Sequence, residues 1–174
     1  MTRPALVLAL ALLAGCSPEP ATVPDFMEVA GQLLRFAERD ARAHQPGRAS
    51  DGPLYVNLFS FRNAARTLTR QDVEVDSIAA ALGDPVQAEQ IQVMMCDTVG
   101  FGGCWVRKYG IWVNWNLAGG GAREIEASVR TMSTDRRVHP TNFCDRVWRL
   151  RFQKQEAGWA LTDSILRRDC LESD

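Results

Sequence analysis

The side chains best suited to acid–base catalysis are scarce in this sequence of 174 residues. There are two histidines, His44 and His139, and the chain has neither the G-x-S-x-G motif of a serine nucleophile nor the H-E-x-x-H motif of a zinc protease. His44 falls at the expected end of a helix, where the helix dipole favours histidine, and His139 precedes a proline in a polar stretch. We expect both to be structural or solvated and predict no catalytic residue, which argues against an enzyme without excluding one.

Three carboxylates alternate in the sequence DVEVD, at Asp72, Glu74 and Asp76. On an extended segment they share one side, and oxygen ligands suit Ca²⁺, but the segment lacks the glycine and the ligand spacing of an EF-hand loop. A solvated strand face explains them better, so we expect no metal and no cofactor. The 20 basic and 21 acidic side chains nearly cancel, which gives no support to nucleic-acid binding.

Cys16 closes an apolar leader. Arg3 is followed by about ten apolar residues (residues 5–14), roughly half of what a bilayer-spanning helix needs, so the leader predicts a cleaved secretory signal peptide. The sequence L-A-G-C at residues 13–16 resembles the lipobox of bacterial lipoproteins. The resemblance implies cleavage before Cys16, lipidation of that residue with diacylglycerol and palmitate-type chains, and a membrane anchor. The alternative is a secreted protein with an incidental cysteine.

These features predict three parts: a signal peptide (residues 1–15), a lipidated cysteine with a proline-rich tether (residues 16–24) and a single α+β domain (residues 25–174). The three prolines of the tether predict an extended, semi-rigid spacer about 25 Å long. Because Ser17 rather than aspartate follows the cysteine, the resemblance to proteobacterial lipoproteins implies the outer membrane, facing the periplasm or the cell surface.

Four further cysteines predict two disulfides, because an oxidising envelope compartment favours them. Their spacing does not match zinc ribbons or fingers. Four cysteines allow three pairings, and the C-terminal segment of the chain favours one of them.

That segment, residues 147–166, alternates like a β-hairpin around the three-residue loop 156–158, where Gly158 would supply a left-handed conformation. The register of this loop sets the following residues opposite each other: Gln155 and Trp159, Arg151 and Asp163, Trp148 and Leu166, Cys144 and Cys170. We therefore predict the disulfide Cys144–Cys170, which leaves Cys96–Cys104 as the second.

The apolar periodicity predicts a long helix over Asp25–His44, begun by an approximate capping box of Asp25 and Glu28. Residues 60–90 are mixed, with a short helix at 76–82. Strands are predicted at residues 53–59, 91–96, 104–117, 123–132 and in the final hairpin.

The predicted fold class is α+β: a long N-terminal helix packed on a curved, mostly antiparallel sheet of about five to six strands, with two disulfides. This element order resembles the NTF2-like and cystatin-like folds, in which a sheet wraps an N-terminal helix. The final hairpin, W-R-L-R-F-x-K-x-x-x-G-W-x-L-T, resembles the last hairpin of uncharacterised envelope lipoproteins.

The tryptophans are the remaining candidates for recognition. Trp112 is out of phase with its apolar neighbours in the predicted strand, so it should face the opposite side. Trp112, Trp105 and Phe101 are therefore candidates for a binding surface, since aromatic residues are favoured in such sites. Packing in the core or in a second layer is the alternative, and the composition favours it.

The leading hypothesis is a membrane-anchored envelope lipoprotein whose domain is not catalytic and binds a ligand or partner: an envelope protein, a peptide or a glycan. One alternative is an NTF2-like enzyme with a small concave pocket, which needs no sequence motif. Another is an inhibitory or docking module that acts through the loop of residues 97–103.

Overall fold

The computed structural model describes residues 18–44, 52–84, 86–87, 94–96, 104–106, 110–134 and 143–170. Cys16, Phe101, His139 and the loop of residues 97–103 lie outside these ranges. The expectations placed on them therefore remain predictions.

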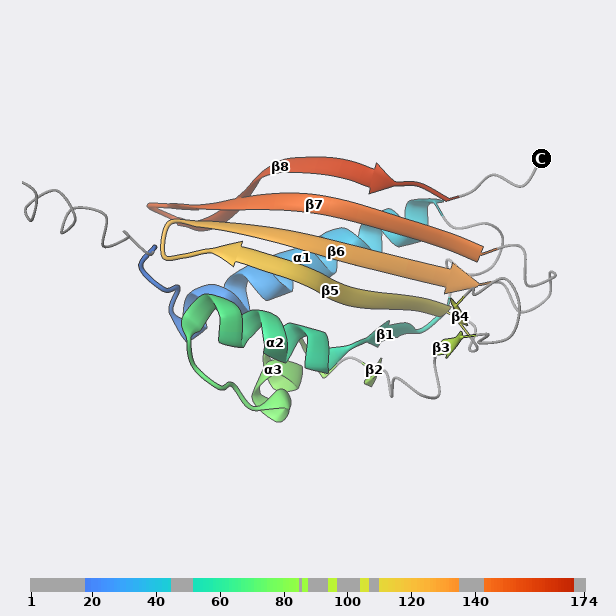
Figure 1. The fold of residues 1–174 in the computed structure, drawn as a ribbon, viewed down its shortest axis with the longest axis horizontal. Coiled ribbons are helices and arrows are strands. Elements are labelled where there is room, and N and C mark those ends of the chain that lie inside the picture. Colours follow the sequence, from blue (N-terminus) through green and yellow to red (C-terminus); the bar gives the residue numbers. More distant parts are fainter. Residues whose placement is uncertain are drawn as a thin grey trace, which may run out of the picture.

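The described chain folds as α+β around a six-stranded open sheet (Figure 1). The sheet has the order β2-β1-β5-β6-β7-β8; β1 runs parallel to both neighbours and the other pairs are antiparallel. β3 and β4 form a separate antiparallel pair. The elements are α1 (Val23–His44), β1 (Leu54–Val56), α2 (Leu58–Thr69), α3 (Val75–Ala81), β2 (Val86–Gln87), β3 (Met94–Cys96), β4 (Cys104–Val106), β5 (Gly110–Gly120), β6 (Glu124–Thr134), β7 (Phe143–Gln155) and β8 (Gly158–Arg168).

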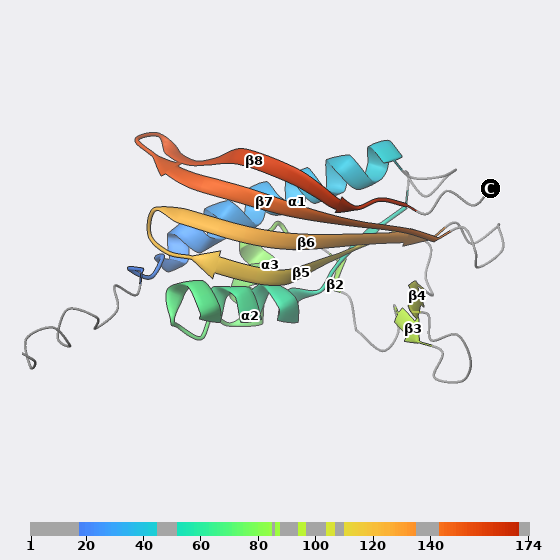
Figure 2. The same ribbon diagram turned by 45° about the horizontal axis from the view of Figure 1, so that its top comes forward.

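Helices α1 and α2 cover one face of the sheet, here called the inner face (Figure 2). Trp115 of β5 lies between them: its ring stacks on Phe26 of α1 at 5.6 Å and meets Phe61 of α2 edge-on at 5.3 Å. All three side chains are buried, as is Leu33 at the centre of α1. The apolar stripe predicted for α1 therefore faces the sheet as expected.

The start of α1 differs from the prediction by two residues. The helix begins at Val23, and the capping box is formed by Thr22 and Asp25: the Asp25 amide donates to Thr22 Oγ1 at 3.2 Å, and the Thr22 amide donates back to Asp25 Oδ2 at 3.3 Å. The predicted capping partner Glu28 instead accepts a hydrogen bond from the Trp159 amide of β8 at 2.9 Å.

The strand predicted at residues 53–59 is mostly wrong, because β1 is short and a helix follows it at once. Asn57 caps α2 by accepting a hydrogen bond from the Ser60 amide at 3.3 Å. The buried side chains of α2 recur every three or four residues, at Leu58, Phe61, Ala64, Ala65 and Leu68. This spacing indicates a helix, and the sequence prediction overlooked it.

The predicted strand at residues 104–117 is also wrong as a single element. Its first residues form β4, which pairs with β3, and residues 110–117 belong to β5 in the main sheet. Of the segment predicted at residues 91–96, Met94–Cys96 is strand, but it lies outside the main sheet.

The C-terminal hairpin confirms the predicted register only in its middle. Trp148 lies opposite Leu166 and Arg151 opposite Asp163, as predicted. The turn contains two residues rather than three, so Gln155 lies opposite Gly158 and not opposite Trp159. A register shift between Arg151 and Phe152 reconciles the two parts.

One disulfide, rather than the two predicted, is present among the described residues. It joins Cys144 to Cys170, whose Cα atoms lie 4.5 Å apart, and confirms the first predicted pair. Cys96 and Cys104 are opposite each other in the β3–β4 register. A bridge between them remains a prediction.

Candidate functional site

Each end of α1 holds a cluster of polar side chains that faces the sheet. Each is centred on an aspartate that is 8% exposed: Asp25 in the first turn and Asp40 near the last turn. Within the apolar stripe of α1 these carboxylates are exceptions, and helical spacing places Asp40 on the face of Ala37 and Ala41. That spacing was the sequence signal for the second cluster.

Asp40 accepts hydrogen bonds from two residues of β7. Arg146 donates through Nε at 2.9 Å and through Nη2 at 3.2 Å, and the Trp148 indole donates through Nε1 at 2.7 Å. The Arg146 guanidinium also lies over the Trp148 ring at 5.6 Å and pairs with Asp169. Because Arg146 is only 4% exposed, this is a buried charge pair that depends on all of its partners.

His44 is the one predicted acid–base candidate within the described residues. Its Nδ1 lies 3.2 Å from Asp40 Oδ1 and 2.9 Å from the Asp40 carbonyl oxygen, while about half of its side chain is exposed. A histidine oriented in this way has its other ring nitrogen turned away from the carboxylate, as a general base requires. The Asp40 carboxylate, however, already accepts hydrogen bonds from Arg146 and Trp148. These contacts give Asp40 a structural role.

Asp25 holds the other end of α1 against β7 and β8. Its Oδ1 accepts from the Trp159 indole at 2.9 Å and from Lys154 Nζ at 2.8 Å, and its Oδ2 accepts from the Thr22 hydroxyl at 2.7 Å. Burial by itself would raise the pKa of Asp25, but the hydrogen bonds from Lys154, Trp159 and Thr22 outweigh it and hold that pKa well below its usual range. The carboxylate is therefore ionised at neutral pH and acts as a fixed acceptor.

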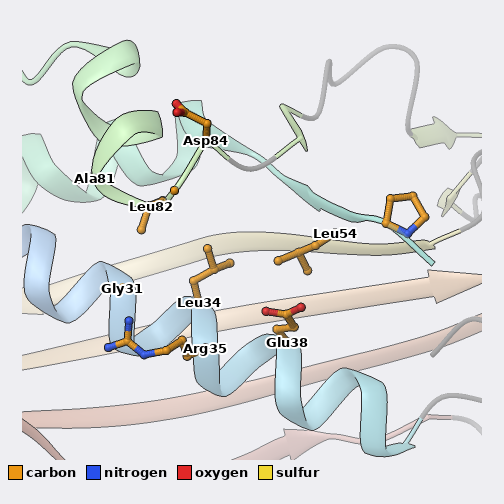
Figure 3. Close-up of a pocket in the computed structure, with 10 residues that line it drawn as sticks. Gly31, Leu34, Arg35, Glu38, Leu54, Ala81, Leu82 and Asp84 are labelled. Atoms are coloured by element: carbon orange, nitrogen blue, oxygen red, sulfur yellow. The ribbon is translucent and has the colours of Figure 1, made fainter. Parts of the chain in front are cut away.

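A groove of about 430 Å³ opens between α1, the start of β1 and the end of α3 (Figure 3). Leu34, Leu54 and Leu82 give it an apolar floor. Its charged side chains are Arg35, Glu38 and Asp84, and Glu38 is held by Arg42 at 2.8 Å. The lining contains no serine, cysteine or histidine, so the groove lacks a hydroxyl or thiol nucleophile and a histidine base.

The outer face of the sheet carries the predicted tryptophan candidate. Trp112 faces away from Trp115, as predicted, but it is only 3% exposed and lies opposite the buried Met132 of β6. This burial agrees with the alternative that the composition favoured, in which Trp112 packs in the core or in a second layer. The side chain of Trp105, like Phe101, lies outside what the structure describes.

Farther along the outer face the surface is charged. Glu126 of β6 accepts hydrogen bonds from Arg149 at 2.6 Å and from Arg151 at 2.8 Å, and the bond from Arg149, followed by that from Arg151, lowers the pKa of Glu126. A groove of about 390 Å³ beside them includes Gly119 and Arg167. These are cross-strand ion pairs of a solvated sheet face.

The three carboxylates considered as calcium ligands do not act together. Asp72 is paired with Arg62 through two hydrogen bonds, at 2.9 and 3.0 Å, while Glu74 precedes α3 and Asp76 lies in its first turn. Within the described ranges, no three His, Cys, Asp or Glu side chains come together as a metal site.

Residues 18–22, which belong to the segment predicted as an extended tether (residues 16–24), pack against the fold; residues 16 and 17 lie outside the described ranges. The buried Ala21 donates its amide to the Leu68 carbonyl at 3.0 Å, and the Ala122 amide donates to the Glu19 carbonyl at 2.7 Å. Proline content predicted the extended backbone, but it carried no information about where that backbone docks.

No protein-family model matches this chain, and comparisons with curated proteins and with solved structures give no match either. In the part of the chain that the structure describes, none of the helices is both long and apolar enough to cross a membrane.

Proposed function

We propose that this protein is a lipid-anchored cell-envelope domain without catalytic activity, attached through Cys16, whose role is to present a binding surface close to the membrane. The lipobox resemblance of residues 13–16 provides the anchor. The partner would be an envelope protein, a peptide or a glycan, and the neutral overall charge does not favour nucleic acid.

The observation that carries this proposal is the docking of the segment that begins at Pro18. Pro18, two residues beyond the predicted lipid attachment point, already accepts a hydrogen bond from Arg70 at 3.5 Å. A domain attached in this way has no long spacer, so its surfaces stay close to the membrane. Such an attachment suits a protein that meets a partner in the same layer of the envelope.

Two further observations support a binding domain over the NTF2-like enzyme. On the inner face, the place of a concave pocket is occupied by Phe26, Leu33 and Trp115, which are buried. The carboxylates of Asp25 and Asp40, which face the sheet, accept hydrogen bonds from tryptophan indoles and from cationic side chains. An enzyme site on that face would need unoccupied acid or base groups and space for a substrate.

Mass spectrometry of the N-terminal peptide tests the anchor. The full chain is expressed in a bacterial host that processes lipoproteins, and the membrane fraction is digested and analysed. The proposal predicts a mature N-terminus at Cys16 carrying a diacylglycerol and an amide-linked acyl chain. The C16S variant should lose the lipid and leave the membrane fraction. An unmodified Cys16, or a mature N-terminus elsewhere, would contradict the proposal.

A further inference from the structure

We infer that one end of the domain is its membrane-facing surface: the docked segment Pro18–Thr22, the end of α2, the β5–β6 turn and the β7–β8 turn. The partner of this surface is the phospholipid headgroup layer. The inference rests on the proposed lipid anchor at Cys16 and adds an orientation to it. In that orientation the long axis of the sheet points away from the membrane.

The elements of this end lie together in both ribbon views (Figures 1 and 2). The blue start of the described chain, the beginning of α1 and the turns that join β5 to β6 and β7 to β8 are at the same end of the sheet. The last residues of α1 and β8 are at the opposite end, which also carries the Asp40 cluster and the disulfide.

Three hydrogen bonds fix the incoming chain to this end. They join the Ala21 amide to Leu68, the Ala122 amide to Glu19, and the Arg70 guanidinium to Pro18. The acceptors and donors come from two separate elements, the end of α2 and the β5–β6 turn. The segment is therefore held at more than one point and cannot swing as a hinge about a single contact.

The covalent chain then limits the distance to the lipid. Only Ser17 lies between Cys16 and Pro18, so the two are two positions apart; because an extended chain spans at most about 3.5 Å per residue, the proposed lipid attachment point is at most roughly 7 Å from Pro18. The 22 residues of α1, at about 1.5 Å each, extend about 33 Å from this end. The tether is thus several times shorter than the domain that it orients.

Gly121 shows how close the segment lies to the β5–β6 turn. A Cβ atom built on Gly121 would overlap the Glu19 carbonyl oxygen and would lie 3.1 Å from Pro18 Cβ. Any residue larger than glycine at position 121 would therefore prevent this close approach of Glu19. By contrast, a Cβ on Gly119, two residues earlier, would meet nothing within 4 Å.

The charge of this end indicates that the tether, and not electrostatic attraction, sets the orientation. Its exposed charged side chains are Glu19, Glu28 and Glu156 against Arg66, Arg70, Arg123 and Lys154, and Lys154 is already paired with Asp25, so the two signs nearly balance. A surface that is attracted to anionic lipid presents a cluster of basic side chains. The orientation should therefore be the same on zwitterionic and on anionic vesicles.

Depth-dependent fluorescence quenching tests the orientation. Two exposed alanines are matched label sites: Ala157 in the β7–β8 turn and Ala43 in the last turn of α1. The A157C and A43C variants of the lipidated full chain are labelled with an environment-sensitive dye without reductant. They are then placed on phosphatidylcholine vesicles that carry a nitroxide on the headgroup.

The inference predicts quenching several-fold stronger at position 157 than at position 43, with and without anionic lipid. Equal quenching, or stronger quenching at 43, in protein that carries lipid and floats with the vesicles overturns the orientation and leaves the anchor intact. Protein that carries no lipid and does not float overturns the proposed function, and the orientation with it.

A spacer variant separates the tether from intrinsic affinity. A flexible Gly-Ser insertion between Ser17 and Pro18 should leave flotation unchanged and abolish the difference between the two label sites. If the difference persists, the short tether does not set the orientation and the inference is overturned.

Discussion

The two ends of α1 use the same set of groups. At each end an aspartate of the helix accepts an indole N–H from the sheet, Trp159 for Asp25 and Trp148 for Asp40, and binds a cation of β7. The two aspartates are equally buried, at 8% exposure. Each fixes one end of the helix against the strands.

The cations differ in their exposure to water. The side chain of Lys154, which pairs with Asp25, is 45% exposed, whereas that of Arg146, which pairs with Asp40, is 5% exposed. Arg146 is further bound to Asp169, the neighbour of the disulfide-bonded Cys170. The Asp40 end therefore contains a buried ion pair that lies next to a disulfide. The Asp25 end instead combines a helix cap with a solvent-exposed lysine and the docked N-terminal segment.

Similar polar groups can therefore contribute unequally to the stability of the fold. A buried ion pair leaves an uncompensated charge when one partner is removed, whereas a half-exposed cation regains water. We therefore expect the removal of Asp40 to cost more stability than the removal of Asp25.

The largest expected effect is that of D40A, which leaves Arg146 buried with Asp169 as its remaining carboxylate. We expect the free energy of unfolding to fall by about 3–5 kcal/mol. Guanidinium unfolding followed by tryptophan fluorescence measures it, with D163A on the exposed part of β8 as the control. If the free energy of unfolding fell by less than about 1 kcal/mol, as is typical of a surface ion pair, the two ends of α1 would not differ in the way described above.

Removing the disulfide should come next. Cys144 and Cys170 are separated by 26 positions, and a bridge closing a loop of this size contributes about 2–4 kcal/mol. The C144A/C170A variant should also lose amide protection at the end of β8 before it loses it near Trp159. Uniform loss along β8 would show that the bridge does not act locally.

D25N should have a smaller and pH-dependent effect. Because the pKa of Asp25 is lowered in the folded state, its charge stabilises the fold above about pH 4, and this contribution is lost as the pH falls toward the low folded pKa. We expect D25N to cost about 1–2 kcal/mol at pH 7.

The difference in the free energy of unfolding between D25N and the unmodified protein should become smaller from pH 6 to pH 3. Denaturant unfolding at each pH measures this difference. The E156Q variant, in the exposed turn, provides the control. A gap that widens or stays constant on acidification would contradict the low pKa of Asp25.

The smallest effect is expected from G121A, measured against G119A. The new methyl group would push Glu19 away from the turn. We expect the free energy of unfolding to fall by about 1 kcal/mol, near the lower limit for overpacking, because the segment can move away from the turn. G119A should be close to neutral. Thermal unfolding distinguishes them, and equal stability of the two variants would show that the segment is not docked at Gly121.

Much of the fold could be predicted from local patterns. The periodicity of α1 identified its buried face, and alternation around Trp148 identified β7 and β8 together with the Cys144–Cys170 bridge. These features depend on residues close in sequence or paired across one turn. The missed helix α2 was also accessible, since Asn57 and the spacing of its apolar residues were in view.

The remaining features depend on contacts that local patterns do not encode. Register shifts in the hairpin change which residues are opposite each other, so the turn length was wrong while the middle of the hairpin was right. The docking of Glu19 beside Gly121 joins two segments that are distant in sequence. The two aspartate clusters likewise need the position of α1 on the sheet before their partners can be named.

Hydrogen exchange of two backbone amides tests whether the segment that follows the proposed anchor is docked on the fold. In the lipidated full chain, the Ala21 and Ala122 amides, which donate to Leu68 and Glu19, should exchange slowly. In G121A the exchange of both should become faster while that of the Trp159 amide stays slow. Exchange of Ala21 and Ala122 at the rate of an open chain in the unmodified protein would contradict the docked segment and the orientation that rests on it.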